Sequence, residues 1–424
     1  MTRYLSSPRV PRFDRLVNGS SGRCLGSVLA VAIVSRMVRA SAVPAMVTVF
    51  ALLAVTSVAV RAATTDTTAR AAIVMDMTTG AVLMEKNASM PLPPASMSKL
   101  MTLYLLFDAL RERRVSLETQ FQVSRKAAEM GGSKMFLREG ENVSVENLIR
   151  GVIVQSGNDA SVTIAENLAG TEDAFVRFMN VQANKMGLEN STFANSTGWP
   201  HPRHLVSAQD MVLLAERVIR DFPEFYGYFK EPEFTWDGVT QANRNPLLGL
   251  DAHVDGLKTG HTQAAGYGLV GSAFNGQRRI IFAVFGMESA SERQRESLRL
   301  VNWAFREFSL MTIVERGERI ATANVALGDR DEVGLISTAD IVATAPFWAK
   351  EDVTLKLRYA GPLEAPVKAG DSVAELLVTF PEMPTTSYPL QAESDVGIGG
   401  VVARIKAVIE ILVLEIAGLV PGSI

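Results

Sequence analysis

The amino-acid sequence predicts an α+β protein in which an antiparallel sheet is combined with helices and followed by a small all-β domain and a C-terminal amphipathic helix. Two apolar runs, residues 71–77 and 81–84, flank a Thr-Thr-Gly turn, which is typical of a β-hairpin. Three further strand-like runs follow only at residues 254–287, after a long stretch whose apolar residues recur with helical spacing. Beyond residue 318 short alternating runs replace the helical pattern.

Composition narrows the class of protein. The chain has 424 residues, 47% of them hydrophobic, so it can bury a large core and we expect two domains. With 42 basic and 45 acidic residues it is nearly neutral, and nothing indicates a nucleic-acid partner. Cys24 is the only cysteine, which excludes an internal disulfide and a cysteine-based metal cluster. His201 and His204 lie in a proline-rich loop without neighbouring Cys or Asp, so we expect neither metal nor cofactor.

Residues 1–63 have the pattern of a signal peptide. Basic residues precede two apolar patches, residues 25–34 and 42–60, and the second patch ends in Val60-Arg61-Ala62-Ala63. We expect cleavage near Ala62 or Ala63 and export to the periplasm. The length of the second patch also fits an uncleaved membrane anchor, and the true start codon stays open.

The first motif with chemistry is Ser96-Met97-Ser98-Lys99. It follows Pro91-Leu92-Pro93-Pro94, which cannot be helical throughout, and precedes the almost wholly apolar residues 100–110, which predict a buried helix. A spacing of three residues places the Ser96 hydroxyl and the Lys99 amine on one face of the first turn, where backbone N–H groups favour negative charge. This combination is typical of an activated serine nucleophile. Taken alone, it also fits a capping serine beside a surface lysine.

The second motif, Ser156-Gly157-Asn158, lies on a break between two helices. Residues 111–143 are polar and predict loops and short elements, and Ser144 then caps a helix that ends at Val154. Residues 160–168 are helical again. A hydroxyl and an amide on such a turn can point into a cleft, although the tripeptide alone also fits a capping turn.

The third motif, Lys258-Thr259-Gly260, lies on a predicted strand. A cation and a hydroxyl can bind a carboxylate, and the glycine lets a substrate approach the backbone. As a bare tripeptide it could be an ordinary strand end. The remaining elements expected in this region are helices and antiparallel strands, namely helices 171–186 and 207–219, strands 254–261, 267–274 and 279–287, and a closing helix 291–310 that carries Trp303 and Phe305 inward.

The three motifs in this order resemble those of the serine D-alanyl-D-alanine carboxypeptidases, the low-molecular-weight penicillin-binding proteins of the Ser-x-x-Lys peptidase type. The resemblance spans residues 71–310 and includes Asn195-Ser196-Thr197-Gly198, Asn243-Arg244-Asn245 and residues 254–262. It implies a β-lactamase/transpeptidase-like fold: an antiparallel sheet flanked by helices, with a helical lobe and the active site between them. It also implies cleavage of peptidoglycan stem pentapeptides and covalent inhibition by β-lactam antibiotics.

The resemblance assigns the catalytic roles. Ser96 attacks the terminal D-Ala–D-Ala bond, D-alanine leaves, and water hydrolyses the acyl-enzyme. Lys99 is the expected base, its pKa lowered from the ordinary value of about 10.4 by burial or by a nearby cation such as Lys258. Ser156 passes the proton to the leaving amine, and the backbone N–H groups of Ser96 and His261 form the oxyanion hole.

The resemblance also assigns the substrate contacts. Asn158 holds the substrate amide, and the neighbours Lys258, Thr259, Gly260 and His261 form one wall of the site. Thr259 and an arginine bind the terminal carboxylate. Counting back from Trp303 favours Arg293 for this arginine, with Arg295 as the alternative.

Three other functions stay open at this level. A class A β-lactamase needs a glutamate followed four residues later by asparagine, but here Glu189 is followed by Phe193. A DD-endopeptidase would use the same motifs. A non-catalytic envelope scaffold would have lost one of Ser96, Lys99 and Lys258, all of which are present.

The rest of the chain predicts a second domain and an anchor. We expect a catalytic domain over residues 64–315 and a β-rich domain over 318–392, with alternating runs at 333–336, 353–359 and 372–379. We expect residues 393–424 to be an amphipathic anchor. Within this segment, residues 401–420 form one broad apolar face on a helix, and the four charges in that run fit a helix lying in the membrane interface at the outer face of the inner membrane. The alternative is a helix packed on its own protein.

Overall fold

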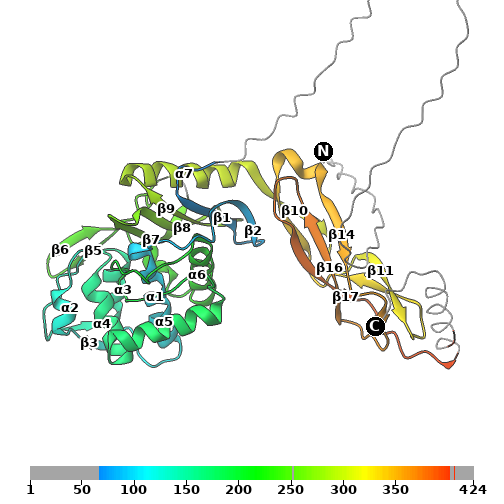
Figure 1. Ribbon diagram of the computed structural model, residues 1–424, viewed down its shortest axis with the longest axis horizontal. Coiled ribbons are helices and arrows are strands. Elements are labelled where there is room, and N and C mark those ends of the chain that lie inside the picture. Colours follow the sequence, from blue (N-terminus) through cyan, green and yellow to red (C-terminus); the bar gives the residue numbers. More distant parts are fainter. Residues whose placement is uncertain (1–65, 251–252, 402–404, 406–424) are drawn as a thin grey trace, which may run out of the picture. The chain divides into compact units, whose positions relative to one another are not determined.

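The computed structural model describes residues 66–250, 253–401 and 405, and it confirms the α+β class with antiparallel sheets, a helical region and a C-terminal β domain (Figure 1). The predicted signal peptide, and all of the predicted anchor helix except residues 393–401 and 405, lie outside the described residues. Among the helices of the described part, none has the length and apolar character needed to cross a membrane.

The catalytic region is built on a five-stranded antiparallel sheet in the order β2-β1-β9-β8-β7. The predicted hairpin is present, and the three predicted late strands are adjacent to one another, as expected. The first strand pairs with the last of them, so that Ile73 lies opposite Ala283. The strand bounds are β1 Ala71–Asp76, β2 Ala81–Lys86, β7 Val254–Thr262, β8 Gly266–Phe274 and β9 Arg279–Met287.

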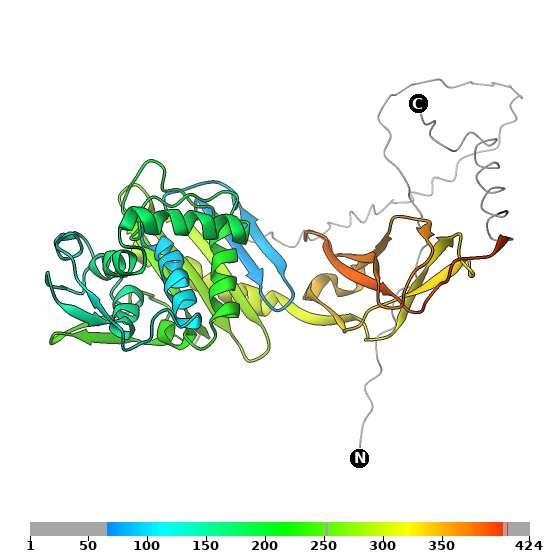
Figure 2. The same ribbon diagram turned by 90° about the horizontal axis from the view of Figure 1, so that it is seen from below.

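Both faces of this sheet are covered by helices (Figures 1 and 2). Because side chains alternate across a strand, Ile281 and Ala283 of β9 join the core on one face, where α6 contacts β1 and β9. Phe282 and Val284 join a second core on the other face, together with Leu300 and other residues of α7. The sheet is therefore rigidly held on both sides, which fixes the position of its edge strand β7.

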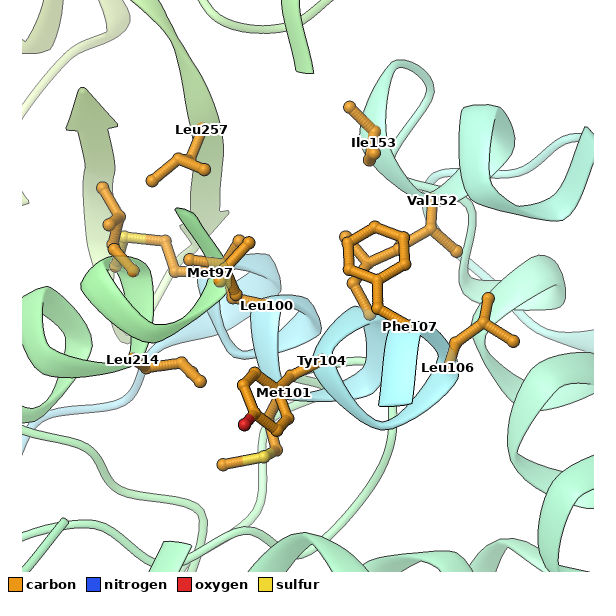
Figure 3. Close-up of a cluster of buried hydrophobic side chains, with 14 of the residues drawn as sticks. Met97, Leu100, Met101, Tyr104, Leu106, Phe107, Val152, Ile153, Leu214 and Leu257 are labelled. Atoms are coloured by element: carbon orange, nitrogen blue, oxygen red, sulfur yellow. The ribbon is translucent and has the colours of Figure 1, made fainter. Parts of the chain in front are cut away.

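The centre of the helical lobe is α1, Lys99–Arg111. Its apolar run is buried on most sides, as predicted. Figure 3 shows Met101, Tyr104 and Phe107 of this helix in one cluster with Val152, Leu214 and Leu257 from three other elements. The surrounding helices are α3 Val145–Ile153, α4 Asn158–Ala169, α5 Glu172–Met186 and α6 Ala208–Asp221.

Capping serines and threonines start three of these helices where the sequence indicates. The hydroxyls of Ser144, Thr171 and Ser207 each accept a hydrogen bond from a backbone N–H one turn further on. The polar stretch 111–143 contains the predicted short elements, which are β3 Gln120–Gln122, α2 Arg125–Glu129 and β4 Asn142–Ser144. Two further elements were not expected from the sequence: the 3-10 turn η2 Tyr226–Lys230, and the hairpin of β5 Glu233–Trp236 with β6 Val239–Ala242.

The closing helix is shorter than predicted. Helix α7 spans Ala290–Glu307, and Phe308 begins strand β10, Phe308–Val314, which pairs with β13, Ile341–Pro346. The prediction that the helix extends to Leu310 is wrong, because pairing with β13 overrides the local helical pattern. Trp303 and Phe305 are only partly buried against the second core.

The β domain has its own hydrophobic core and a six-stranded sheet in the order β14-β16-β17-β12-β11-β15. The predicted runs 333–336, 353–359 and 372–379 correspond to β12, β14 and β16. The bounds are β11 Arg319–Ala326, β12 Glu332–Ile336, the 3-10 turn η3 Phe347–Asp352, β14 Thr354–Arg358, β15 Leu363–Glu364, β16 Ser372–Thr379 and β17 Thr386–Ala392.

Candidate active site

Ser96 lies in a short 3-10 turn, η1 Ala95–Ser98, immediately before Lys99 opens α1. The three-residue spacing brings the two side chains together, and Lys99 Nζ donates a hydrogen bond to Ser96 Oγ at 2.8 Å. Ser96 is partly exposed, whereas Lys99 is fully buried. A reachable hydroxyl is thus bonded to a desolvated amine, which is the arrangement that an activated serine requires.

Lys99 is held by two further acceptors. Its Nζ donates to Asn158 Oδ1 at 2.7 Å and to the Thr197 carbonyl oxygen at 2.6 Å. Burial and, to a smaller extent, the positive charge of Arg244 together lower the pKa of Lys99 to about 7, against the opposing effect of the Asp159 carboxylate. A lysine with this pKa is substantially neutral near neutral pH and can accept a proton.

The second motif forms the turn between α3 and α4, as the sequence predicts. Ser156 has a φ of +60°, in the left-handed region, and the N–H of Gly157 donates to the Gly151 carbonyl oxygen at 2.9 Å. Asn158 begins α4, and its Nδ2 donates to the Gly131 carbonyl oxygen at 2.7 Å. The turn therefore directs both the hydroxyl and the amide toward the two lysines.

The third motif lies on β7 beside the nucleophile turn. Lys258 is buried, and its Nζ donates to Ser156 Oγ at 2.9 Å. Burial lowers the pKa of Lys258 well below its ordinary value, with further contributions from Lys99, Arg244 and Arg293. Because repulsion between the two ammonium groups is mutual, this site disfavours the state in which both lysines are protonated.

Gly260 has a packing role in addition to the substrate approach expected from the sequence. A Cβ atom at this position would lie 2.7 Å from the Pro94 carbonyl oxygen and 3.0 Å from Met97 Cγ. The missing side chain therefore lets β7 approach the turn that carries Ser96. Thr259 is buried in the same strand, and His261 is exposed at its end.

Of the two candidate arginines, Arg293 is the one near the motifs. It is 8% exposed, its guanidinium lies 5.7 Å from the centre of the Tyr267 ring, and its Nε has no hydrogen-bond partner. Tyr267 also contacts His261: the centres of their two rings are 3.8 Å apart. Arg295 instead lines a separate cavity with Glu288, Glu292 and Glu296. A buried cation with a free donor suits a carboxylate ligand.

Sequence reasoning assigned no role to Arg244, although its motif was noted. The structure places its charge close enough to lower the pKa of both Lys99 and Lys258. The next residue, Asn245, is buried and donates from Nδ2 to the Gly256 carbonyl oxygen at 3.0 Å, which ties this loop to β7. The Asn243-Arg244-Asn245 motif was the one feature of the sequence that could have pointed to this arginine.

The contact between Lys99 and Thr197 was also missed. Asn195 Oδ1 accepts hydrogen bonds from the backbone N–H groups of Thr197, Gly198 and Trp199, and so fixes this turn. Gly198, at a φ of +80°, packs so closely that a Cβ would lie 1.8 Å from the Ala95 carbonyl oxygen. The turn is therefore seated directly against the nucleophile.

The acids expected of other enzyme classes are not at this site. Glu189 is exposed just after α5, and Phe193 is buried in the core. Asp159 accepts hydrogen bonds from the N–H groups of residues 135–137, and among the described residues no carboxylate bonds to Ser96 or Lys99. Within the same described part, no group of three His, Cys, Asp or Glu side chains could hold a metal. His201 is exposed and His204 is buried beside Phe193.

Comparisons with known proteins agree with this geometry. A family described as D-alanyl-D-alanine carboxypeptidase matches residues 57–289, and the C-terminal domain of penicillin-binding protein 5 matches residues 308–397. The D-alanyl-D-alanine carboxypeptidase DacD of Salmonella typhimurium is 36% identical over 323 residues, which are 74% of this chain and 82% of that protein.

Two solved structures are similar as well. Penicillin-binding protein 5 of Haemophilus influenzae aligns with a TM-score of 0.71 and 35% identity, covering 78% of this chain and 98% of that one. Penicillin-binding protein D2 of Listeria monocytogenes, solved in an ampicillin-bound form, aligns with a TM-score of 0.53 and 30% identity, covering 57% of this chain and 99% of that one. The chain belongs to the D-alanyl-D-alanine carboxypeptidase family and is a serine-type hydrolase of the penicillin-binding class.

Proposed function

We propose that this carboxypeptidase removes the terminal D-alanine from peptidoglycan stem pentapeptides through an acyl-enzyme on Ser96. The observation that carries the proposal is the pair of bonds from Lys99 Nζ to Ser96 Oγ and from Lys258 Nζ to Ser156 Oγ. Each of two buried amines is bonded to a serine hydroxyl, so protons can be taken up and delivered within one site.

In the acylation step, neutral Lys99 accepts the proton of Ser96 as Oγ attacks the carbonyl carbon of the penultimate D-alanine. The backbone N–H groups of Ser96 and His261 stabilise the oxyanion, each donor contributing roughly 3 kcal/mol. The C–N bond then breaks, and the proton passes through the Ser156 hydroxyl to the leaving amine. Water cleaves the resulting ester, and the serine hydroxyl is restored.

Substrate orientation comes from the two walls of the site. Arg293 and Thr259 bind the terminal carboxylate, in keeping with the free Nε of Arg293. Asn158, already bonded to Lys99 and to the Gly131 carbonyl, holds the substrate amide. Gly260 contributes backbone close to the nucleophile turn. The scissile carbonyl is thereby placed over Ser96.

The same reaction explains inhibition by β-lactams. A β-lactam carbonyl acylates Ser96, but the leaving amine stays tethered to the acyl group and blocks the approach of water. The ampicillin-bound relative supports this extension. No Glu–Asn pair of the β-lactamase kind follows α5, so the penicilloyl ester has no dedicated hydrolytic base there.

Labelling with a fluorescent penicillin, followed by mapping of the modified peptide, tests the proposal together with D-alanine release from a pentapeptide. We expect the label on Ser96, a long-lived penicilloyl enzyme, and steady D-alanine release. Rapid penicillin turnover without D-alanine release would instead identify a β-lactamase.

The proposed location is the periplasm, at the outer face of the inner membrane. The signal-peptide pattern of residues 1–63 supports export. The large apolar residues Ile398, Val401 and Ile405 are each more than half exposed at the start of the amphipathic segment, which supports a membrane-bound tail. Apolar burial rather than attraction to anionic lipid would hold it, since the segment has few basic residues.

A further inference from the structure

Trp199 is a large aromatic residue that the mechanism above does not use. Its side chain is 47% exposed although it lies two residues from Thr197, whose carbonyl oxygen accepts a hydrogen bond from Lys99. Exposing an indole is unfavourable, and a single exposed aromatic needs no explanation elsewhere on a surface. Here the exposed indole belongs to the same turn as the carbonyl group that binds the catalytic lysine.

The backbone around Trp199 is held firmly. Its N–H donates to Asn195 Oδ1 at 3.0 Å and to Thr197 Oγ1 at 3.1 Å, and its carbonyl oxygen accepts from Asn195 Nδ2 at 2.9 Å. The preceding Gly198 is packed against Ala95 beside the nucleophile. The indole is therefore presented from a fixed turn, so a ligand that stacks on it loses little conformational entropy of the protein.

The ring lies over Gly131 and Gly132. A Cβ on Gly131 would be 3.3 Å from Trp199 Cη2, and a Cβ on Gly132 would be 3.2 Å from Cζ3 of the same ring. The latter point is also 3.0 Å from Asn158 Nδ2, so the indole edge adjoins the amide that we assign to the substrate. The edge of the ring that packs over the two glycines is therefore also the edge beside Asn158, while Trp199 as a whole stays 47% exposed.

The direction of the substrate follows from the two walls. If the terminal carboxylate is bound at Arg293, the peptide must run from there across Ser96 toward Asn158 and the residues beyond it. Trp199 is the exposed apolar surface that adjoins Asn158. The site already carries four basic residues, namely Lys99, Lys258, Arg244 and Arg293, which would repel a further positive charge on the ligand. The aromatic face of Trp199 therefore suits the methylene chain of a neutral or capped side chain better than it suits a cationic one.

We propose that Trp199 is a specificity-determining residue, whose indole stacks on the long aliphatic side chain of the residue on the amino side of the D-Ala–D-Ala unit. The inference rests on the proposed carboxypeptidase function and extends it to the choice of substrate. If this is correct, Trp199 should increase kcat/KM only for peptides that have a residue before the D-Ala–D-Ala unit.

The test compares kcat/KM for D-alanine release from two substrates. N-acetyl-D-Ala-D-Ala lacks the additional residue, and Nα,Nε-diacetyl-L-Lys-D-Ala-D-Ala has it with a capped aliphatic side chain. In Trp199→Ala we expect the preference for the longer substrate to fall by about fivefold or more. Trp199→Phe, which keeps an aromatic face, should retain most of the preference. Trp348→Ala is the matched control, because Trp348 is also 47% exposed but lies in the β domain, and it should change nothing.

Two results would overturn the inference. An equal loss on both substrates would mean that the indole only supports the Gly131–Gly132 loop, and an unchanged preference would mean that it does not contact the longer peptide. If the unmodified protein releases no D-alanine from either substrate, the proposed function itself fails, which is a different result.

Discussion

Lys258 Nζ lies 2.9 Å from Ser156 Oγ, so the edge strand of the sheet is hydrogen-bonded to the turn between two helices of the helical lobe. A matching bond joins Lys99 to Asn158 in the same turn. The Ser156-Gly157-Asn158 turn is consequently bonded to both lysines at once. Moving the lobe relative to the sheet would break the bond between Lys258 and Ser156, whereas the bond between Lys99 and Asn158 lies within the lobe.

Replacing Ser96 by alanine should abolish covalent labelling by penicillin and leave the thermal unfolding midpoint nearly unchanged, because the loss is of chemistry rather than packing. Ser98→Ala is the matched control. Its buried hydroxyl donates to the Ala95 carbonyl oxygen, so its removal should cost about 1 kcal/mol of stability yet leave labelling intact. Labelling that persists in Ser96→Ala would refute the assignment of the nucleophile.

The acylation rate should depend on pH through Lys99. Only the neutral amine can accept the Ser96 proton, and the pKa of Lys99 is about 7. Below that pH the neutral fraction falls tenfold per unit, so the second-order rate of acylation should fall likewise, and above it the rate should level off. Stopped-flow acylation with a chromogenic β-lactam measures this profile. A flat profile below pH 7 would exclude Lys99 as the base.

Replacing Arg244 by alanine should shift that profile. The guanidinium lowers the pKa of Lys99, so its removal raises this pKa and moves the rising limb to higher pH. The rate at pH 6 should therefore drop more than the plateau rate. Arg295→Ala removes an exposed cation that lines a different cavity and should leave the limb in place. If the rising part of the pH–rate profile lies at the same pH in both variants, Arg244 does not act on the pKa of Lys99.

Replacing Arg293 by alanine should weaken recognition of the terminal carboxylate. A hydrogen bond to a charged group contributes about 1.5–3 kcal/mol, so kcat/KM for a peptide ending in D-Ala–D-Ala should fall roughly tenfold to a hundredfold. An amidated substrate, which has no carboxylate, should respond much less to the substitution. A loss of equal size with Arg295→Ala would reopen the choice between the two arginines.

If the protein is exported and anchored as proposed, removing residues 402–424 should release it from membranes without loss of activity. The cut leaves the bond from the Gly399 N–H to the Leu327 carbonyl oxygen in place, so the β domain keeps its last described contact. Fractionation of cells with and without the segment measures the effect. If the truncated protein still sediments with membranes, the tail is not the anchor and the N-terminal segment becomes the better candidate.

Much of the fold and the site follows from local sequence. The spacing of Ser96 and Lys99 in one helical turn, the capping hydroxyls of Ser144 and Ser207, and the hairpin at Gly80 are all properties of a few neighbouring residues. Neighbouring residues alone determine such features, and the structure contains each of them.

What escaped prediction depends on partners distant in sequence. The acceptor that Thr197 offers to Lys99 is a backbone carbonyl, which every residue has, so no residue type marks it. The charge of Arg244 acts on the lysines only because the fold brings its loop beside β7. The end of α7 at Glu307 is likewise set by the pairing of β10 with β13. Local propensity cannot report these effects.

The pairing of β1 with β9 has a consequence for the newly made chain. The first strand of the sheet finds its partner only when Arg279–Met287 has been synthesised, and until then the hairpin β1–β2 lacks the neighbour on which its core depends. Folding of the catalytic region must therefore wait for almost its whole length to leave the ribosome. If residues 1–63 act as the proposed signal peptide, the chain behind them is still unfolded while it is being made. An unfolded chain is the form that a secretion channel can transport.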